Sequence, residues 1–319
     1  MARHVILGKG PIGRTLATHL LDAGHEVVVL SRSGGPPGPA RPGLSWAAVD
    51  GADAAALTSA AQDADALYNC VNPPYHRWPT DWPPVAEALL VAAERTGAVL
   101  VTAGNLYSYG AGTQLMTEAS PFRTRETKGL VRATMSTQAL RHHHEGRLRS
   151  TEVRGSDYLG PGAEAHAHAG PRMLEPLLAG KTVRPIGAAD VLHTWTYLPD
   201  FARTLAAAAT TEAAWGQAWH VPSPEPLTFR ELARRFASAA GAPEPRVAPV
   251  PMALVRTIGL VQPMMREVAA MGYQFTEPFV MDSTASQVAL GLTPTPWPTV
   301  VAETLAAFTG ASGPAVRTE

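Results

Sequence analysis

Three glycines, Gly8, Gly10 and Gly13, follow an apolar run and open a helical segment in HVILGKGPIGRTLATHLLDAG. Glycines at this spacing permit a tight turn, a close approach of backbone to a pyrophosphate, and close packing of helix on strand. The helix N-terminus then directs its N–H groups at the phosphates. We therefore expect a dinucleotide site that also uses Pro11 and Ile12, with an ordinary glycine turn as the alternative.

The end of the next apolar run, VVVLSRS, bears on the choice of cofactor. An NAD site usually has Asp or Glu here, which accepts hydrogen bonds from the ribose 2′-hydroxyl. Ser31 takes that place and Arg32 follows it. A guanidinium suits a 2′-phosphate, whereas a carboxylate would repel it, so the sequence predicts NADP. The alternative is that Arg32 is a solvated loop cation.

A second polar group of residues could act on a substrate. TAGNLYSYG, residues 102–110, places an amide, two phenols and a hydroxyl directly after the apolar run AVLV. The amide of Asn105 could donate to a carbonyl oxygen or an oxyanion. The phenol of Tyr107 could supply a proton. The alternative for Tyr107 is a structural phenol packed beneath the loop.

The elements around these residues alternate between short apolar runs and longer helical segments, which is typical of a parallel sheet covered on both faces. The fold class that we predict is α/β, a Rossmann-type doubly wound parallel sheet with a smaller C-terminal substrate-binding subdomain. The expected strands are residues 4–8, 26–31, 44–50, 66–71, 98–104 and 147–155. The expected helices between them are residues 12–23, 54–62, 85–96 and 127–145.

After Gly155 the alternation loosens, and helices at 228–240 and 252–271 mix with brief strands at 182–187, 193–198 and 217–222. We therefore predict an NADP-binding core in residues 1–160, to which residues 191–224 return. Residues 161–190 and 225–319 are expected to form the substrate-binding subdomain.

Several further segments carry a resemblance. AAVDGAD, NCVNPP, EVRGSDYLGPG and GAADVLHTWTYLPDFARTL resemble segments of one known family. WHVPSPEPLTFRELA and MDSTASQVALGLTPTPW match the late landmarks of that family in order and spacing. The chain resembles the extended or atypical short-chain dehydrogenase/reductases, the NAD-dependent epimerase/dehydratase family, along nearly its whole length. The resemblance implies cofactor contacts from Asp50 near the adenine, from Val71, Asn72 and Pro73 at the nicotinamide ribose, and from Tyr158 beside the nicotinamide.

The resemblance also assigns roles in catalysis and exposes a departure. Asn105 takes the position of a Ser/Thr that bonds the reacting oxygen, and Tyr107 that of a catalytic acid in the family's dehydratases. The family carries Tyr-x-x-x-Lys on the next helix. In RETKGLVRATM, Lys128 stands at the tyrosine position and Arg132 at the lysine position. The resemblance thus implies Arg132 on the cofactor ribose and Lys128 near the substrate, with the proton donor relocated or redox chemistry lost.

The substrate pocket is expected to be apolar. Family members that act on nucleotide sugars place a diphosphate-binding arginine where this chain has His193, and a neutral imidazole is a poor clamp for a diphosphate. We expect His193 and Trp195 at the substrate, with Tyr75 and Trp78 from the loop NPPYHRWPTDWPP. Aromatic side chains of this kind suit an apolar, adaptable pocket.

Composition excludes several other classes. The net charge is -1, and 17% of residues are charged without runs of one sign. We therefore expect a small-molecule substrate, no nucleic acid and no membrane, and leave a homodimer open. The single cysteine rules out a disulfide within the chain. No metal site is expected, and His142, His143 and His144 are interpreted as cations at a helix end. The predicted location is the cytoplasm, since no signal peptide is recognised.

These expectations converge on an NADP-dependent oxidoreductase-like enzyme acting on a small apolar carbonyl or alcohol. Two alternatives stay open. One is a redox-silent NADP-binding regulator or scaffold, because the family's tyrosine is missing from its helix. The other is a sugar-nucleotide epimerase or dehydratase.

Overall fold

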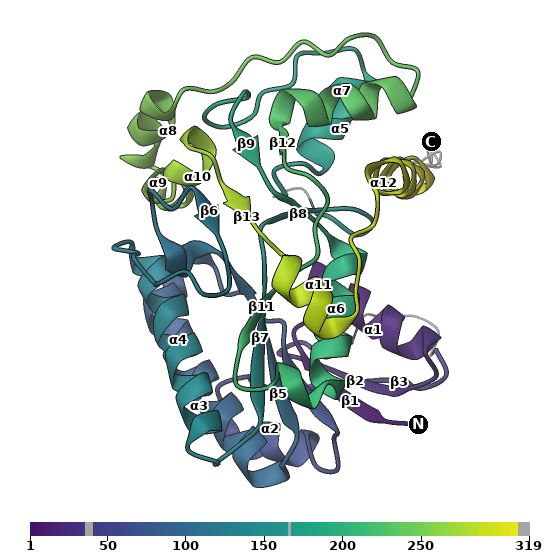
Figure 1. The fold of residues 1–319 in the computed structure, drawn as a ribbon, viewed down its shortest axis with the longest axis vertical. Helices are drawn as coiled ribbons and strands as arrows, with labels where there is room; N and C mark the ends of the chain where they lie inside the picture. Colours follow the sequence, from purple (N-terminus) through teal and green to yellow (C-terminus); the bar gives the residue numbers. More distant parts are fainter. Residues whose placement is uncertain (36–40, 165–166, 312–319) are drawn as a thin grey trace, which may run out of the picture. The chain divides into compact units, whose positions relative to one another are not determined.

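The computed structural model describes residues 1–35, 41–164 and 167–311, which Figure 1 shows as a ribbon. Contacts divide the chain into two compact units. The first unit consists of Met1–Gly155, Phe201–Pro222 and Met281–Leu292. The second consists of Ser156–Asp200, Ser223–Val280 and the chain from Thr293 on.

The first unit is built on a seven-stranded sheet in the order β11-β7-β5-β4-β1-β2-β3. All the neighbouring strands in this sheet are parallel. The strands are β1 (Arg3–Leu7), β2 (Glu26–Ser31), β3 (Leu44–Ala48), β4 (Ala66–Asn69), β5 (Val99–Asn105), β7 (Ser150–Gly155) and β11 (Ala218–His220). The order reverses between β1 and β4, and ligands bind at the carboxyl ends of the strands at such a point.

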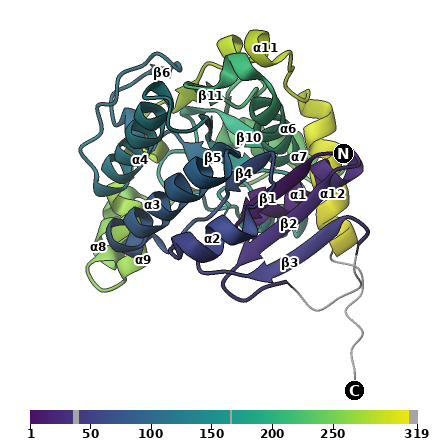
Figure 2. The same cartoon turned by 90° about the horizontal axis from the view of Figure 1, so that it is seen from below.

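Helices cover both faces of this sheet. Apolar side chains of α1 (Pro11–Asp22) and α6 (Leu198–Thr210) pack with the central strands in one buried cluster. The opposite face carries α2 (Ala54–Ala60), α3 (Trp78–Thr96) and α4 (Thr127–His144), as Figure 2 shows. The strands are therefore buried on both sides, which explains why they read as continuous apolar runs. Shorter elements of the unit are η1 (Tyr75–Arg77), η2 (Tyr107–Tyr109), β6 (Leu115–Met116), η3 (Glu212–Ala214) and α11 (Thr284–Leu290).

The second unit has its own apolar core, which α5, α7 and α12 build around Trp195 and Tyr197. Two short strand pairs accompany it, β8 with β10 in parallel and β9 with β12 antiparallel. These strands are β8 (Asp157–Leu159), β9 (Leu192–His193), β10 (Trp195–Tyr197) and β12 (Leu227–Thr228), and β13 (Val280–Met281) follows them. The helices are α5 (Pro171–Leu178), α7 (Phe229–Ala239), α8 (Met252–Gly259), α9 (Pro263–Ala270), α10 (Tyr273–Thr276) and α12 (Trp297–Ala311).

The predicted doubly wound sheet is confirmed, and the six expected strands of the first half are all present. The largest error in that half concerns α3, which begins at Trp78 instead of residue 85. Pro83 and Pro84, which suggested a loop, lie inside the helix. Trp78 and Trp82 are one helical turn apart and fully buried, so their packing offsets the lost backbone hydrogen bonds.

Two further differences lie beyond Gly155. The helix expected over 252–271 is two helices, because α8 ends at Gly259 and Pro263 starts α9. Residues 182–187 form only isolated bridges, Val183 with Val247 and Ile186 with Val250.

The contact-based division into two units also departs from the predicted boundaries. It assigns Ser156–Asp200 as a whole to the second unit and Met281–Leu292 to the first.

Candidate active site

The glycine loop between β1 and α1 has the geometry that a dinucleotide needs. Gly8 has a positive φ of 118°, and a Cβ there would strike the carbonyl oxygen of Cys70 at the end of β4. A Cβ on Gly13 would strike the carbonyl oxygen of Gly8. A Cβ on Gly10, by contrast, would meet nothing within 4 Å. Gly8 and Gly13 are thus required by packing, and Gly10 faces open space where a phosphate group could approach.

The N-terminus of α1 adds donors to the same place. Gly10 is its N-cap and no side chain caps it, while Pro11 occupies the first helical position. The N–H groups of Ile12 and Gly13 lie in the first turn, which has no earlier helical carbonyls to bond. The loop and this helix end fit the pyrophosphate of a dinucleotide cofactor.

The residues at the end of β2 form a small polar site. Ser31 Oγ donates to the carbonyl oxygen of Gly34 at 2.7 Å, and Arg32 is exposed. Lys9, inside the glycine loop, donates to Ser33 Oγ at 2.7 Å and to Gly34 O at 3.0 Å. Lys9 is not among the predicted cofactor contacts, although its place between two of the loop glycines is a sequence signal for such a role. Asp50 is exposed and accepts the N–H of Ala52 at 3.1 Å, near the start of α2.

The segment after β4 borders this loop. Val71 N–H donates to Asn69 Oδ1 at 3.3 Å, and Pro73 O accepts the indole N–H of Trp78 at 2.9 Å. Asn72 is exposed, whereas Val71 and Pro73 are half-buried. Cys70 is buried, and burial raises the pKa of its thiol to about 12, so it is not a nucleophile at neutral pH.

The end of β5 brings Asn105 and Tyr107 together. The N–H of Tyr107 donates to Asn105 Oδ1 at 3.2 Å, a local turn that fixes the amide. Because Oδ1 is engaged in this way, Nδ2 is the end of the amide that can donate to a substrate oxygen. The phenol of Tyr107 lies 3.0 Å from that of Tyr75, from η1 after β4. Tyr107 is 7% exposed.

The first turn of α4 is held against this turn. A Cβ on Gly129 would meet the Tyr107 carbonyl oxygen at 2.5 Å, so only glycine allows the helix to come this near. Its neighbour Lys128 is 2% exposed, and its ammonium lies 5.5 Å from the centroid of the Tyr75 ring. Gly129 was not identified from sequence, although a glycine inside a helix often has such a packing reason.

Arg132 lies one turn further along α4, between two indoles. Its guanidinium carbon is 4.9 Å from the Trp78 ring centroid and 4.6 Å from that of Trp82. Nη1 donates to Ala103 O at 3.4 Å, and burial lowers the pKa of Arg132. Trp78 is fully buried in this stack, and the substrate contact expected of it stays a prediction. The ribose contact of Arg132 stays a prediction.

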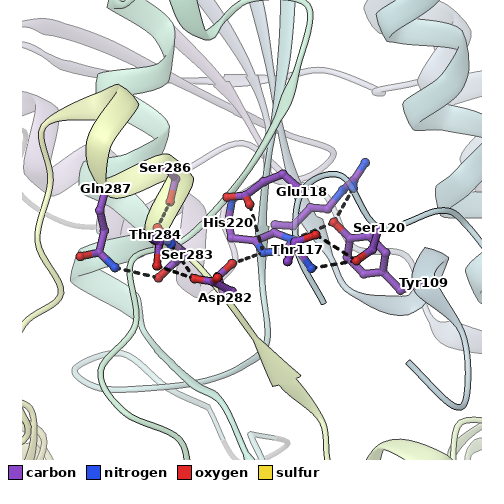
Figure 3. A network of polar contacts seen from close by, with 11 residues as sticks. Tyr109, Thr117, Glu118, Ser120, His220, Asp282, Ser283, Thr284, Ser286 and Gln287 are labelled. Carbon is purple, nitrogen blue, oxygen red and sulfur yellow. Dashed lines mark hydrogen bonds and ion pairs between the residues drawn. The ribbon is translucent and has the colours of Figure 1, made fainter. Parts of the chain in front are cut away.

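A buried polar network, part of which is drawn in Figure 3, begins at Tyr109, two residues after Tyr107. Arg154 Nη1 donates to the phenol of Tyr109 at 2.8 Å, and that phenol donates to His220 Nε2 at 2.7 Å. His220 Nδ1 in turn donates to the carbonyl oxygen of Asp282 at 2.6 Å. Burial lowers the pKa of His220, which keeps the ring neutral. Tyr109 is fully buried, and its phenol is hydrogen-bonded to both Arg154 and His220.

The second unit holds the remaining predicted residues. His193 Nε2 lies 3.0 Å from Asp157 Oδ2 and 3.3 Å from Ser156 Oγ. Trp195 is 1% exposed, and its indole donates to Leu227 O at 3.0 Å. Tyr158 is half-buried on β8. His193 and Trp195 are thus largely buried within their own unit, and their substrate role stays a prediction.

In the histidine run at the end of α4, the structure bears on the charge of His143. His143 Nδ1 accepts the N–H of Ser150 at 3.3 Å, and burial lowers the pKa of His143. The prediction of a cation is therefore wrong for His143, whose ring is neutral at neutral pH. Among the residues that the structure describes, no three His, Cys, Asp or Glu side chains are grouped to hold a metal ion. Within the same ranges, no helix is long and apolar enough to cross a bilayer.

Comparison with known proteins decides the family. The model of the NAD dependent epimerase/dehydratase family matches residues 5–221. The chain belongs to this family. It is therefore an enzyme of the short-chain dehydrogenase/reductase type with a nicotinamide cofactor. No match to a curated protein sequence was found.

Solved structures of similar fold include enzymes of sugar-nucleotide metabolism. UDP-glucose 4-epimerase of Thermotoga maritima, with UDP-glucose, has 15% identity and a TM-score of 0.79 over 97% of this chain and 99% of that one. MoeE5 in complex with UDP-glucose and NAD has 18% identity and a TM-score of 0.78 over 98% and 100%. DesIV, a dTDP-glucose 4,6-dehydratase of Streptomyces venezuelae, has 20% identity and a TM-score of 0.78 over 98% of each chain. These likenesses establish the fold.

Proposed function

We propose that the enzyme is an NADP-dependent oxidoreductase that interconverts a small apolar carbonyl compound and its alcohol. The observation that carries this proposal is the polar wall, which we define as Tyr75, Asn105, Tyr107 and Lys128. It combines an amide donor, two hydrogen-bonded phenols and a buried ammonium at the carboxyl ends of β4 and β5. These groups can orient a carbonyl, stabilise negative charge on its oxygen and supply a proton.

The cofactor, when bound, exchanges a hydride with the substrate carbon. The chain's own residues bind and orient the reactants. Gly10 and the N-terminus of α1 would hold the pyrophosphate, because that space is open and its donors are uncapped. The amide Nδ2 of Asn105 would donate to the substrate oxygen.

Three observations favour NADP over NAD. Ser31 stands where an acidic residue would otherwise bind the ribose hydroxyls, and the exposed Arg32 follows it. Lys9 reaches from the glycine loop to Ser33 and Gly34 just beyond. The two cations Lys9 and Arg32 suit a 2′-phosphate, because the position that is acidic in NAD sites is here a serine.

Replacing Ser31 by Asp and Arg32 by Ala is expected to invert the cofactor preference from NADP(H) to NAD(H). The discrimination at stake is about 1–3 kcal/mol, the range for a charge-assisted hydrogen bond. Fluorescence titration of both reduced cofactors against wild type and variant measures it. Lys9→Met should weaken NADPH binding alone, and Lys181→Met, which removes an exposed lysine of the second unit, is the matched control. Equal affinities of the wild type for the two cofactors would contradict the assignment.

Loss of the amide at Asn105 is expected to lower turnover by about 10²-fold, because it removes a donor to the developing oxyanion. Asn105→Asp separates this role from the turn. The carboxylate can still accept the N–H of Tyr107, as Asn105 Oδ1 does, but it cannot donate. We expect both Asn105→Ala and Asn105→Asp to lose turnover of NADPH with a ketone. Full activity of Asn105→Asp would show that the amide only shapes the turn.

A second candidate is supported by two solved structures that contain UDP-glucose, one of which also contains NAD. Such an enzyme would act on a nucleotide sugar without net consumption of cofactor. His193 stands against it, since the family resemblance puts a diphosphate-binding arginine at this place. One assay distinguishes the two functions. Oxidation of NADPH by the enzyme in the presence of acetophenone or cyclohexanone supports the oxidoreductase. Conversion of UDP-glucose or dTDP-glucose in the presence of NAD supports the alternative. Tight NADPH binding with neither reaction would indicate a redox-silent binding protein.

A further inference from the structure

We propose that Tyr75 is the proton donor of this enzyme and that Tyr107 and Lys128 assist it. The inference rests on the oxidoreductase function proposed above. Its starting point is a contact between distant segments, because the phenols of Tyr75 and Tyr107 lie 3.0 Å apart although the residues are 32 positions apart in sequence.

Exposure separates the two phenols. Tyr107 is 7% exposed and therefore has little surface with which to touch a substrate. Tyr75 is half-buried and therefore has more exposed surface than Tyr107. Trp78 packs against both rings, with centroid distances of 5.2 Å to Tyr75 and 6.1 Å to Tyr107. The accessible phenol is thus the better proton donor, and the buried one is held as its partner.

The hydrogen bond between the phenols determines what happens to the charge. A single proton lies between the two oxygens, and we assign it to Tyr107, so that Tyr75 accepts this bond and keeps its own proton for the substrate. Once Tyr75 has given up that proton, its phenolate still accepts the O–H of Tyr107. A hydrogen bond to an ionised oxygen is about twice as strong as a neutral one, so the pair favours the product of proton transfer.

Lys128 supplies the positive charge. Its ammonium lies 5.5 Å from the Tyr75 ring centroid and is 2% exposed, so water screens it little. A nearby cation favours the anionic form of a phenol. Gly129 allows the first turn of α4 to approach the carbonyl of Tyr107, which keeps Lys128 beside the phenol pair. The phenol and ammonium of the family's Tyr-x-x-x-Lys are therefore supplied here by two separate segments.

The proposed step is balanced. In the direction of reduction, a bound reduced nicotinamide would supply the hydride for the new C–H bond at the carbonyl carbon and would itself be oxidised. The electron pair of the C=O π bond moves to the oxygen, which takes the proton of Tyr75. The Tyr75 phenolate then recovers a proton from solvent water.

The first experiment needs no substrate. Tetranitromethane nitrates phenolates, so we would treat the intact wild-type protein with it and map the modified tyrosines by peptide mass spectrometry. Tyr75 is expected to react fastest of the tyrosines, and Lys128→Met should slow its nitration by about tenfold or more. Lys181→Met, the control, should leave the rate unchanged. A Tyr75 rate that is the same in wild type and Lys128→Met would overturn the inference.

The second experiment measures turnover of NADPH with acetophenone or cyclohexanone. Tyr75→Phe should lower kcat by about 10²–10⁴-fold while leaving NADPH affinity unchanged. Tyr107→Phe should lower it by only about 10-fold, because the donor remains and one charge-assisted bond is lost. Tyr68→Phe is the control, since it removes a buried phenol that bonds His4 at 3.1 Å, away from the polar wall.

The outcomes separate the two proposals. A larger loss in Tyr107→Phe than in Tyr75→Phe would make Tyr107 the donor and overturn the inference, while the oxidoreductase function would stand. If the wild type reduces neither ketone, the proposed function fails for these substrates, and the nitration experiment alone decides whether Lys128 activates Tyr75.

Discussion

Replacing Arg154 by Leu is expected to lower the free energy of unfolding by about 3–5 kcal/mol, the usual result of removing one partner of a buried ion pair. Arg154 is 2% exposed and its Nη2 lies 2.8 Å from Glu152 Oε2. Burial opposes its charge, but Glu152 and the phenol of Tyr109 outweigh that effect and hold the pKa of Arg154 above its usual value. The variant would remove from the buried Glu152 carboxylate the guanidinium that donates a hydrogen bond to it.

Denaturant unfolding of wild type and variant, followed by circular dichroism, measures this loss. Adding Glu152→Gln to Arg154→Leu should recover part of the stability, because the stranded charge is then removed. Arg147→Leu is the matched control. It breaks an exposed pair with Glu94 at 2.8 Å, and the midpoint should change little. If Arg154→Leu lowers the free energy of unfolding no more than Arg147→Leu does, the buried network does not stabilise the fold.

The same network explains why Tyr109→Phe would be a poor control for variants of Tyr107. The phenol of Tyr109 both accepts from Arg154 and donates to His220. Phenylalanine would leave both groups buried without this partner, which costs about 1–3 kcal/mol for each unsatisfied polar group. A buried phenol of this kind needs a hydrogen-bond partner, so its oxygen cannot be removed without cost.

The parts of the site that could be predicted are those that a short segment determines by itself. Gly8, Gly10 and Gly13 follow a strand and open a helix, and each has a local geometric role that its spacing reveals. The local turn in which Asn105 accepts the N–H of Tyr107 likewise spans only a few residues. The strands of the sheet could also be predicted, because each is a short apolar run that is buried on both faces.

The parts that could not be predicted depend on contacts between distant segments. Pro83 and Pro84 favour a loop, and only the packing of Trp78 and Trp82 on Arg132 of another helix explains why a helix forms there. The pairing of Tyr75 with Tyr107 depends on how the segment after β4 folds over the end of β5. No periodicity in either segment contains that information.

Stability is expected to fall as the pH is lowered from about 6.5 towards 5, because three buried histidines stay neutral in the folded protein. Burial lowers the pKa of His4 to about 4, with the charge of His25 adding to it and Asp65 opposing it. Burial likewise lowers the pKa of His168 to about 4, with Asp157 opposing and His193 and Arg172 adding to the shift. His220 is shifted in the same direction by burial, against Glu118 and Asp282 and with Arg154.

The sign follows from the unfolded chain. Each folded pKa is below the unfolded value of 6.5, so the unfolded state takes up protons first. The stabilisation is therefore complete above pH 6.5 and is lost as the pH falls towards the folded pKa. Between pH 6.5 and 5 the loss is about 1–2 kcal/mol for His168, and a smaller, solvent-screened amount for His4. Carboxylates with lowered pKa values add their own loss only at lower pH.

Denaturant unfolding at about pH 7.5 and about pH 5 tests this, with the difference between the two free energies as the measured quantity. His4→Leu removes one buried titrating group from β1. Among the described residues, His4 Nε2 has no hydrogen-bond partner. This variant should lose less stability on acidification than the wild type. His76→Leu, on the exposed segment before α3, is the control and should retain the wild-type difference. If the wild type has the same free energy of unfolding at both pH values, protonation of these histidines does not destabilise the fold. Burial of their rings would then not govern the response to acid.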